Sequence, residues 1–176
     1  MVKTNIALLG FMGTGKTSVS KALAKKLGIE YIETDRLIEN RVGKPIAQIF
    51  KEDGEATFRE LETTIIKEIA ERDNVIISCG GGIVLNNENT ITLKKKAIIV
   101  LLTASPEVIW ERISKTNERP LLDIPNKLER IQMLLDFRDP LYQSAADLVI
   151  DTDLLTVDEV TNIIIEEISK STNYRK

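Results

Sequence analysis

An α/β fold, in which helices cover both faces of a parallel β-sheet, is predicted from three observations on the sequence. Short apolar runs rich in β-branched residues alternate with segments whose apolar residues recur at helical spacing. Strands that alternate with helices are joined by right-handed crossovers, which give a parallel sheet. The chain has 176 residues and shows no internal repeat and no Pro/Gly/Ser-rich linker. We therefore expect a single domain over residues 1–176.

The expected strands and helices follow one another in regular order. The strands are expected at Asn5–Leu9, Tyr31–Thr34, Val75–Ser78, Ala97–Leu102 and Asp147–Ile150. The helices are expected at Thr17–Leu27, Glu55–Ala70, Pro106–Ser114, Lys127–Phe137 and Val157–Ile168. Two stretches, Gly43–Asp53 and Thr116–Pro125, interrupt the alternation. Loops of this kind are either lids over a site or plain surface connections.

The first expected strand leads directly into a glycine-rich turn. Residues 10–17 read Gly-Phe-Met-Gly-Thr-Gly-Lys-Thr and match the phosphate-binding pattern G-x-x-x-x-G-K-[ST]. In this pattern backbone amides surround phosphate oxygens, Lys16 reaches the β and γ phosphates, and Thr17 offers a hydroxyl to Mg²⁺. The residues expected to bind the nucleotide here are Gly13, Thr14, Gly15, Lys16, Thr17 and Ser18.

Other nucleotide-binding classes fit the sequence less well. A dinucleotide-binding turn would need a third glycine, which the segment Gly13–Ser18 lacks. A GTPase would show D-x-x-G and N-K-x-D segments, and the nearest approach, Asn126–Glu129, is interpreted as a helix start. Motors and large ATPases need a longer chain. A small-molecule kinase is therefore favoured.

The second expected strand ends in the acidic sequence Glu33-Thr34-Asp35. The alternation of a strand places Glu33 and Asp35 on one face, where both could address a metal and an acceptor. A carboxylate there could take the proton of an acceptor hydroxyl. Alternatively, Thr34 or Asp35 caps the next helix. The residues alone leave the two interpretations open.

The third expected strand runs into Ser78-Cys79 and three consecutive glycines, Gly80, Gly81 and Gly82. Such glycines indicate either close approach of the backbone to a ligand or unusual backbone dihedrals. Ser78 stands where a nucleotide-binding strand presents a group to a metal, whereas Cys79 is interpreted as a small packed residue.

Composition excludes several kinds of chemistry and several kinds of partner. The chain has no histidine and one cysteine, which excludes Ser-His-Asp and Cys-His nucleophiles, His-ligated zinc and internal disulfides. Its net charge of −3 argues against a nucleic-acid partner. The apolar run Ala97–Leu102 is far shorter than the ~20 residues of a membrane span. With a lone cysteine, we expect a cytoplasmic protein without membrane partners, acting as a monomer.

Taken together, these motifs resemble the shikimate kinase family over roughly residues 4–150. Further motifs that carry the resemblance are Asp53-Gly54-Glu55 followed by Phe58-Arg59, Arg119-Pro120-Leu121-Leu122 and Arg138-x-Pro140-Leu141-Tyr142. The resemblance implies the three-layer α/β/α fold of P-loop kinases, with a five-stranded parallel sheet of order 2-3-1-4-5. It also implies an acceptor-binding segment at about 35–62 and a lid at about 114–125.

The activity implied by this resemblance is transfer of the γ-phosphoryl group of ATP to the 3-hydroxyl of shikimate. The products would be shikimate 3-phosphate and ADP, the cofactor would be Mg²⁺, and the pathway would be aromatic amino-acid biosynthesis. Two alternatives remain: a gluconate-type kinase on the same fold, and a nucleotide-binding regulatory module without acceptor chemistry.

The resemblance also implies roles for individual residues on the acceptor side. Asp35 would contact the acceptor hydroxyl and serve as base. Arg59 and Arg138 would bind the shikimate carboxylate, with Glu62 orienting them. The backbone amides of Gly80, Gly81 and Gly82 would contact the ring substituents.

On the nucleotide side, the implied roles involve charge stabilisation, adenine contact and metal binding. Lys16 and the lid residue Arg119 would stabilise the transferring phosphoryl group. Arg112 would pack against adenine, whose other wall would come from Asp151–Leu155. The residues expected around Mg²⁺ are Thr17, Glu33 and Ser78. The family usually has aspartate where this chain has Glu33, so the longer side chain is expected to alter the metal contact rather than remove its charge.

Overall fold

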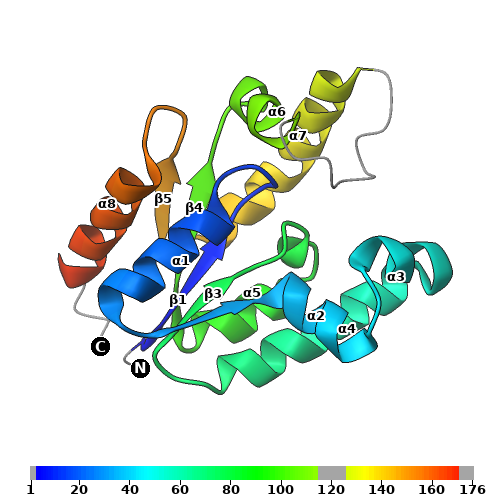
Figure 1. The fold of residues 1–176 in the computed structure, drawn as a ribbon, viewed down its shortest axis with the longest axis horizontal. Coiled ribbons are helices and arrows are strands. Elements are labelled where there is room, and N and C mark those ends of the chain that lie inside the picture. Colours follow the sequence, from blue (N-terminus) through cyan, green and yellow to red (C-terminus); the bar gives the residue numbers. More distant parts are fainter. Residues whose placement is uncertain (1–2, 115–125, 171–176) are drawn as a thin grey trace.

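A computed structural model describes residues 3–114 and 126–170 and contains one five-stranded parallel sheet (Figure 1). The strand order is β2-β3-β1-β4-β5, as the resemblance implied. The strands are β1 (Asn5–Leu9), β2 (Glu30–Glu33), β3 (Val75–Ser78), β4 (Ala97–Thr103) and β5 (Leu148–Asp151). The expected strands are thus confirmed, with ends that differ by a residue.

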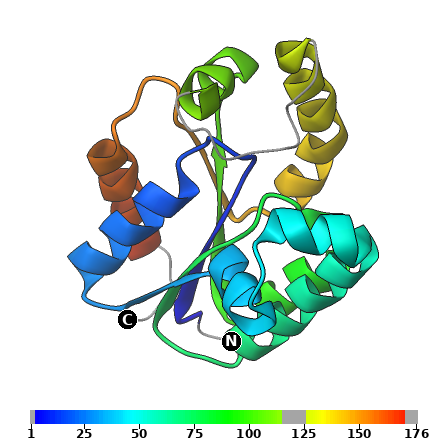
Figure 2. The same cartoon turned by 45° about the vertical axis from the view of Figure 1, so that its right-hand side comes forward.

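Helices cover both faces of this sheet (Figure 2). They are α1 (Lys16–Leu27), α2 (Thr34–Val42), α3 (Ile46–Glu52), α4 (Gly54–Ala70), the 3₁₀ turn η1 (Ile83–Leu85), α5 (Asn87–Lys94), α6 (Pro106–Ser114), α7 (Lys127–Ala145) and α8 (Val157–Lys170). Within the described residues no helix is both long enough and apolar enough to cross a bilayer.

Alternation along β1 divides the core into two layers. Ile6 and Leu8 pack with residues of α1 and α8, whereas Ala7 and Leu9 pack with residues of α2 to α5 and the end of α7. All four side chains are fully buried. A strand buried on both faces reads as a continuous apolar run, which is why this segment has no polar alternation.

Three helical segments differ from the sequence-based expectations. The interruption at Gly43–Asp53 contains α3, whose Ile49 is buried and whose Phe50 ring lies 4.7 Å from that of Phe58. Helix α5 was not expected; its start is capped by Asn86, whose side-chain oxygen accepts from the Glu88 amide. Helix α7 continues past Phe137, through Pro140, to Ala145, because its last turns bury apolar side chains in the core.

Candidate active site

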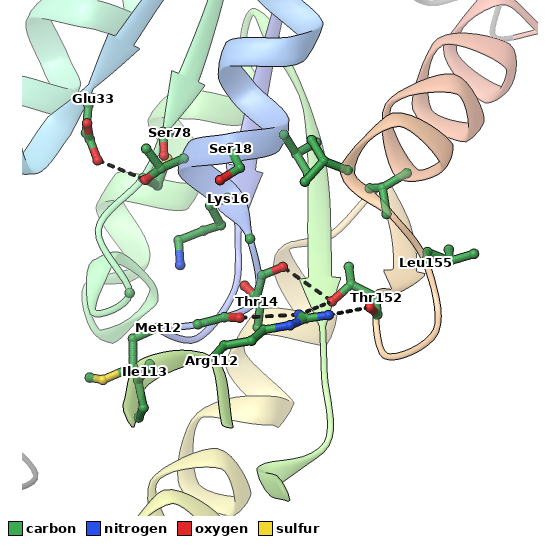
Figure 3. A pocket seen from close by; sticks show the side chains of 18 of the residues that line it. Met12, Thr14, Lys16, Ser18, Glu33, Ser78, Arg112, Ile113, Thr152 and Leu155 are labelled. Atoms are coloured by element: carbon green, nitrogen blue, oxygen red, sulfur yellow. Dashed lines mark hydrogen bonds between the residues drawn. The ribbon is translucent and has the colours of Figure 1, made fainter. Parts of the chain in front are cut away.

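A cavity of about 570 Å³ lies at the carboxyl ends of the strands, as is usual for open α/β sheets (Figure 3). It is bordered by the turn between β1 and α1, by the ends of β2 and β3, by α6 and by the segment after β5. The expected site residues that line it are Gly13, Thr14, Gly15, Lys16, Thr17, Ser18, Glu33, Asp35, Ser78, Gly81 and Arg112. The fold therefore gathers most of the predicted nucleotide and metal side in one place.

The turn between β1 and α1 has the backbone shape of a phosphate-binding loop. Gly13 and Gly15 have φ values of 80° and 95°, in the left-handed region that favours glycine. The Lys16 ammonium donates to the carbonyl oxygens of Gly10 and Phe11, at 2.8 Å each. Helix α1 begins here without a side-chain cap, so its first amides can meet an anion.

Oxygen donors suited to Mg²⁺ lie beside this loop. The Thr17 hydroxyl donates to Oε1 of Glu33 at 2.9 Å, and Ser78 is the cross-strand neighbour of Glu33 in the β2–β3 register. Two hydroxyls and one carboxylate suit a cation that keeps several waters and binds substrate phosphates. Among the described residues there is no group of three or more His, Cys, Asp or Glu that could hold a metal by itself. This donor set thus fits a metal that arrives with a nucleotide.

The expectation that Glu33 and Asp35 share a strand face is wrong. Strand β2 ends at Glu33 and α2 begins at Thr34, so Asp35 lies in the first turn of a helix. The capping alternative also fails, because the N-cap position is Glu33 and no side chain caps it. The Thr34 hydroxyl instead accepts from the Gly80 amide at 2.9 Å. Glu33 and Asp35 nevertheless both line the cavity.

Tyr31 is a residue of this site that the sequence reasoning missed. It lies two positions before Glu33 in β2, on the same face, and its hydroxyl donates to Oε2 of Glu33 at 2.9 Å. Burial, followed by the nearby Glu33 carboxylate, raises the pKa of Tyr31, so its hydroxyl remains a donor. The period-two rule, applied from Glu33 towards the N-terminus, would have found it.

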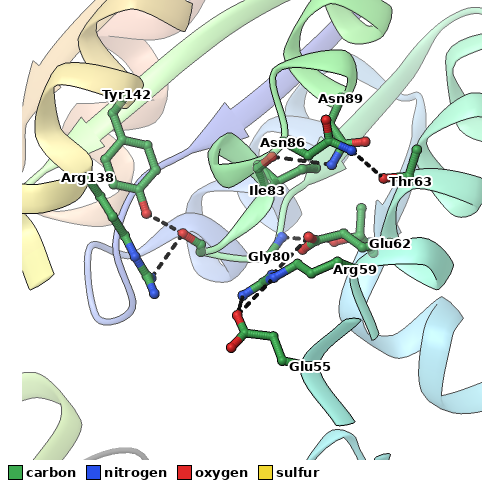
Figure 4. A network of polar contacts seen from close by, with 12 residues as sticks. Glu55, Arg59, Glu62, Thr63, Gly80, Ile83, Asn86, Asn89, Arg138 and Tyr142 are labelled. Carbon is green, nitrogen blue, oxygen red and sulfur yellow. Dashed lines mark hydrogen bonds and ion pairs between the residues drawn. The ribbon is translucent and has the colours of Figure 1, made fainter. Parts of the chain in front are cut away.

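On the acceptor side, Arg59 and Glu62 form an ion pair on α4 (Figure 4). The Arg59 Nη1 donates to Oε2 of Glu62 at 2.9 Å, and Nη2 donates to Glu55 at 3.0 Å. The Glu62 side chain is 1% exposed. Burial raises the pKa of Glu62 to about 7, against the opposing effect of Arg59. The charges of Asp35 and Arg138 also affect the pKa of Glu62. Glu62, Arg59, Asp35 and Arg138 therefore form one cluster of charged groups.

Arg138 approaches the glycine run from α7 (Figure 4). Its Nη1 donates to the Gly81 carbonyl at 3.4 Å, and the Tyr142 hydroxyl donates to the same oxygen. The Arg138 guanidinium lies 5.7 Å from the centre of the Phe11 ring. Its Nε is buried and has no hydrogen-bond partner among the described residues. An anion between Arg138 and Arg59 would meet two cationic side chains.

Close approach of neighbouring side chains accounts for two of the three glycines at 80–82. A Cβ on Gly80 would collide with Oδ1 of Asp35, and a Cβ on Gly82 would collide with the Arg59 guanidinium. A Cβ on Gly81 would make ordinary contacts, the nearest at 3.6 Å from the Gly10 carbonyl oxygen. None of the three has a positive φ. The explanation from unusual dihedrals is therefore wrong, and the close approach that the structure shows is that of the Asp35 and Arg59 side chains.

Arg112 joins α6 to the phosphate loop and to the segment after β5. Its guanidinium donates to the Gly13 carbonyl at 3.3 Å and to the Thr152 hydroxyl and carbonyl at 2.9 and 2.6 Å. Thr152 and Leu155 line the cavity, at the place where a second wall was expected. Thr152 belongs to the expected segment Asp151–Leu155, but no sequence motif singles it out as a partner of Arg112.

The remaining expected residues are less informative. Cys79 is buried, and burial raises the pKa of its thiol, as expected of a packed residue. Arg119 and nearly all of the expected lid lie outside the described residues; only Ser114, the last residue of α6, is described.

Comparison with known proteins gives one consistent result. The family model "Shikimate kinase" matches residues 12–169. A shikimate kinase of Thermodesulfovibrio yellowstonii is 48% identical over 96% of this chain and 97% of its own. One from Caldanaerobacter subterraneus subsp. tengcongensis is 45% identical over 92% of this chain and 94% of its own.

Solved structures agree with these relatives. The shikimate kinase from Acinetobacter baumannii in complex with shikimate aligns with a TM-score of 0.92 at 34% identity, covering 97% of this chain and 95% of that one. A gluconokinase from Sinorhizobium meliloti aligns with a TM-score of 0.58 at 21% identity, over 92% of this chain and 90% of that one. The second likeness shows the fold alone.

Proposed function

The chain belongs to the shikimate kinase family, and on this premise we propose how its residues transfer the γ-phosphoryl group of ATP to the 3-hydroxyl of shikimate. The products are shikimate 3-phosphate and ADP. The observation that carries the proposal is the cluster of Arg59, Glu62, Asp35 and Arg138 around the glycine run, next to the phosphate loop. A carboxylate-bearing acceptor and a nucleotide can therefore be held side by side.

The nucleotide side positions and neutralises the triphosphate. In this proposal, the Lys16 ammonium leaves the carbonyls of Gly10 and Phe11 and binds the β and γ phosphates. Thr17, Glu33 and Ser78 hold Mg²⁺, which neutralises phosphate charge when bound. Backbone amides of the loop and Ser18 bind phosphate oxygens.

The acceptor side orients shikimate and moves one proton. Arg59 and Arg138 bind its carboxylate, because guanidinium forks match carboxylate geometry. The ion pair with Glu62 keeps Arg59 directed at the glycine run. Asp35 accepts the proton of the 3-hydroxyl as that oxygen attacks the γ-phosphorus, and the β–γ bridging oxygen leaves with ADP. The amides of Gly81 and Gly82 contact the ring substituents, whereas the expected role of the Gly80 amide does not hold, because that amide already donates to the Thr34 hydroxyl at 2.9 Å.

Two arginines complete the nucleotide side of the proposal. Arg112, fixed by Thr152 and the loop carbonyl of Gly13, packs against the adenine, with Thr152 and Leu155 opposite. We also propose that Arg119, which lies outside the described residues, stabilises the transferring phosphoryl group as part of a lid at about 114–125.

We further infer that the protein acts as a monomer in the cytoplasm, without membrane or nucleic-acid partners. A free, buried Cys79 suits a reducing compartment, and a net charge of −3 does not favour polyanions. Light scattering coupled to size-exclusion chromatography is expected to give the mass of one chain, and the mass of two chains would overturn the monomer.

Acceptor choice tests the proposed function. ADP formation is followed by a coupled assay with shikimate or gluconate as the only acceptor, at equal ATP and Mg²⁺. We expect turnover with shikimate and none above background with gluconate. Turnover of gluconate alone would overturn the proposal. ATP binding without turnover of either acceptor would support the regulatory module instead.

A further inference from the structure

The Tyr31 hydroxyl lies among the three residues that this account places around Mg²⁺. It donates to Oε2 of Glu33 at 2.9 Å, while the Thr17 hydroxyl donates to Oε1 at 2.9 Å. Ser78 is the cross-strand neighbour of Glu33 in the β2–β3 register. Each oxygen of the Glu33 carboxylate thus has its own hydroxyl donor, one from β2 and one from α1.

A glutamate at this position needs such a restraint more than an aspartate does. Its extra methylene adds a rotatable bond, so more side-chain freedom must be lost to hold the carboxylate in one place. Two donors on opposite oxygens fix both its position and the orientation of its plane. Loss of the Tyr31 hydroxyl would leave Oε2 free to swing away from the Thr17 and Ser78 hydroxyls.

Arg36 is the other described partner of this carboxylate, but it is poorly placed for the same task. Its Nε lies 3.3 Å from Oε2 of Glu33, and its side chain is 70% exposed. Exposed ion pairs contribute little, because water screens them and long side chains move. Tyr31, in contrast, packs against the core layer under α1 and α8, and Lys21 lies 5.8 Å from its ring centre.

We propose that Tyr31 is a positioning residue of the magnesium–nucleotide site, whose hydroxyl holds the Glu33 carboxylate beside the hydroxyls of Thr17 and Ser78. The inference rests on the proposed function and adds a residue to it. Tyr31 touches neither nucleotide nor acceptor in this account and acts through Glu33. Its contribution therefore concerns the metal-bound nucleotide and not the bare one.

Calorimetric titration measures the dissociation constant of ADP, once with Mg²⁺ and once with a chelator in its place. It compares binding of the metal-bound nucleotide with binding of the bare one and requires no turnover. For Tyr31→Phe we expect the dissociation constant of ADP in Mg²⁺ to rise about fivefold, the scale of the net contribution of one ordinary hydrogen bond. Without Mg²⁺ it is expected to stay within about twofold of wild type. Equal losses in both conditions, or no loss in either, would overturn the proposal.

Tyr142→Phe is the matched control, because it removes a tyrosine hydroxyl whose hydrogen bond lies outside the proposed magnesium site. That hydroxyl donates to the Gly81 carbonyl, on the acceptor side. We expect it to leave the Mg²⁺ dependence of ADP binding at the wild-type value. A Tyr142→Phe loss equal to that of Tyr31→Phe would mean a general effect of removing a buried hydroxyl, and would contradict the assignment.

A double-mutant cycle tests whether Tyr31 acts through Glu33. In a Glu33→Ala background there is no carboxylate to hold, so Tyr31→Phe is expected to have no further effect on ADP affinity in Mg²⁺. Persistence of the full fivefold effect there would overturn the proposal. If wild type itself binds ADP equally with and without Mg²⁺, the magnesium site of the proposed function fails. If the ADP affinity of wild type depends on Mg²⁺ and that of Tyr31→Phe depends on it to the same extent, the Tyr31 inference alone fails.

Discussion

Arg59 donates to Oε2 of Glu62 at 2.9 Å, three residues along one helix, and the carboxylate that accepts is almost completely buried. Removing such a carboxylate from water favours its neutral form, and here the effect of burial exceeds that of the adjacent guanidinium. The pair that would orient the substrate-binding arginine is therefore also sensitive to pH.

This pair predicts a pH dependence of folding stability. The pKa of Glu62 is raised from 4.5 to about 7, so the folded state binds an extra proton between these values. The stability that this proton contributes is fully present below the unfolded-state pKa and is lost as pH rises through about 7. Relative to Glu62→Gln, the wild-type free energy of unfolding should fall by up to about 3 kcal/mol across this window.

Urea denaturation of both proteins between about pH 5 and pH 8 measures this difference. The comparison with Glu62→Gln cancels the titration of the other carboxylates. A wild-type free energy of unfolding that stays constant relative to that of Glu62→Gln, or that rises relative to it with increasing pH, would contradict the raised pKa.

Arg59→Ala tests the carboxylate-binding role. Loss of a guanidinium that binds the shikimate carboxylate and shields Glu62 should lower kcat/KM for shikimate by about 100-fold, mostly through KM. The KM for ATP should change little. Arg41→Ala is the control, because Arg41 pairs with Glu68 on the exposed side of α4. Steady-state kinetics in which both variants behave alike would contradict the assignment.

The glycine run predicts a contrast between adjacent positions. Gly82→Ala places a methyl group where the Arg59 guanidinium lies, so Arg59 must move and the KM for shikimate should rise about tenfold or more. Gly81→Ala has room for its methyl group and should stay within about threefold of wild type. Measured KM values that rank the two variants the other way would show that close approach to Arg59 is not what requires glycine.

Substitutions of Glu33, at the end of β2, and of Asp35, in the first turn of α2, should differ in their effect on turnover. Asp35→Ala removes the proposed base and should lower kcat by about 100-fold or more. Glu33→Asp keeps a carboxylate beside Thr17 and should retain turnover, within about tenfold of wild type. Asp35→Asn, which keeps the shape, should bind shikimate but turn over as slowly as Asp35→Ala. Small and equal effects at both positions are incompatible with these roles.

The chain's local patterns were enough to predict the sheet and the phosphate loop. Apolar runs such as Val75–Ser78 are buried on both faces, as strands of a covered parallel sheet are. The pattern of glycines followed by Lys16 and Thr17 is specific enough to indicate phosphate binding. The ends of helices were less predictable. Helix α7 continues through Pro140 because Tyr142 and Ala145 find a place in the core, a tertiary effect that no local pattern contains.

The same limit applies to the site. Alternate side chains share a face within strand β2, but this rule does not apply beyond Glu33, because α2 begins at Thr34. Tyr31, rather than Asp35, therefore shares the face of Glu33. The contacts of Arg112 with Thr152 join segments 40 residues apart, and only the folded chain brings them together. Residue types and motifs predicted which groups matter; their partners required the structure.

Phosphoryl transfer to shikimate is tested by ADP release at saturating ATP and Mg²⁺, measured with and without shikimate. We expect release that depends on shikimate, at one ADP for each shikimate 3-phosphate formed, and almost none in its absence. Release at the same rate without shikimate would contradict it, because the acceptor cluster around Arg59 and Asp35 would then have no part in the reaction.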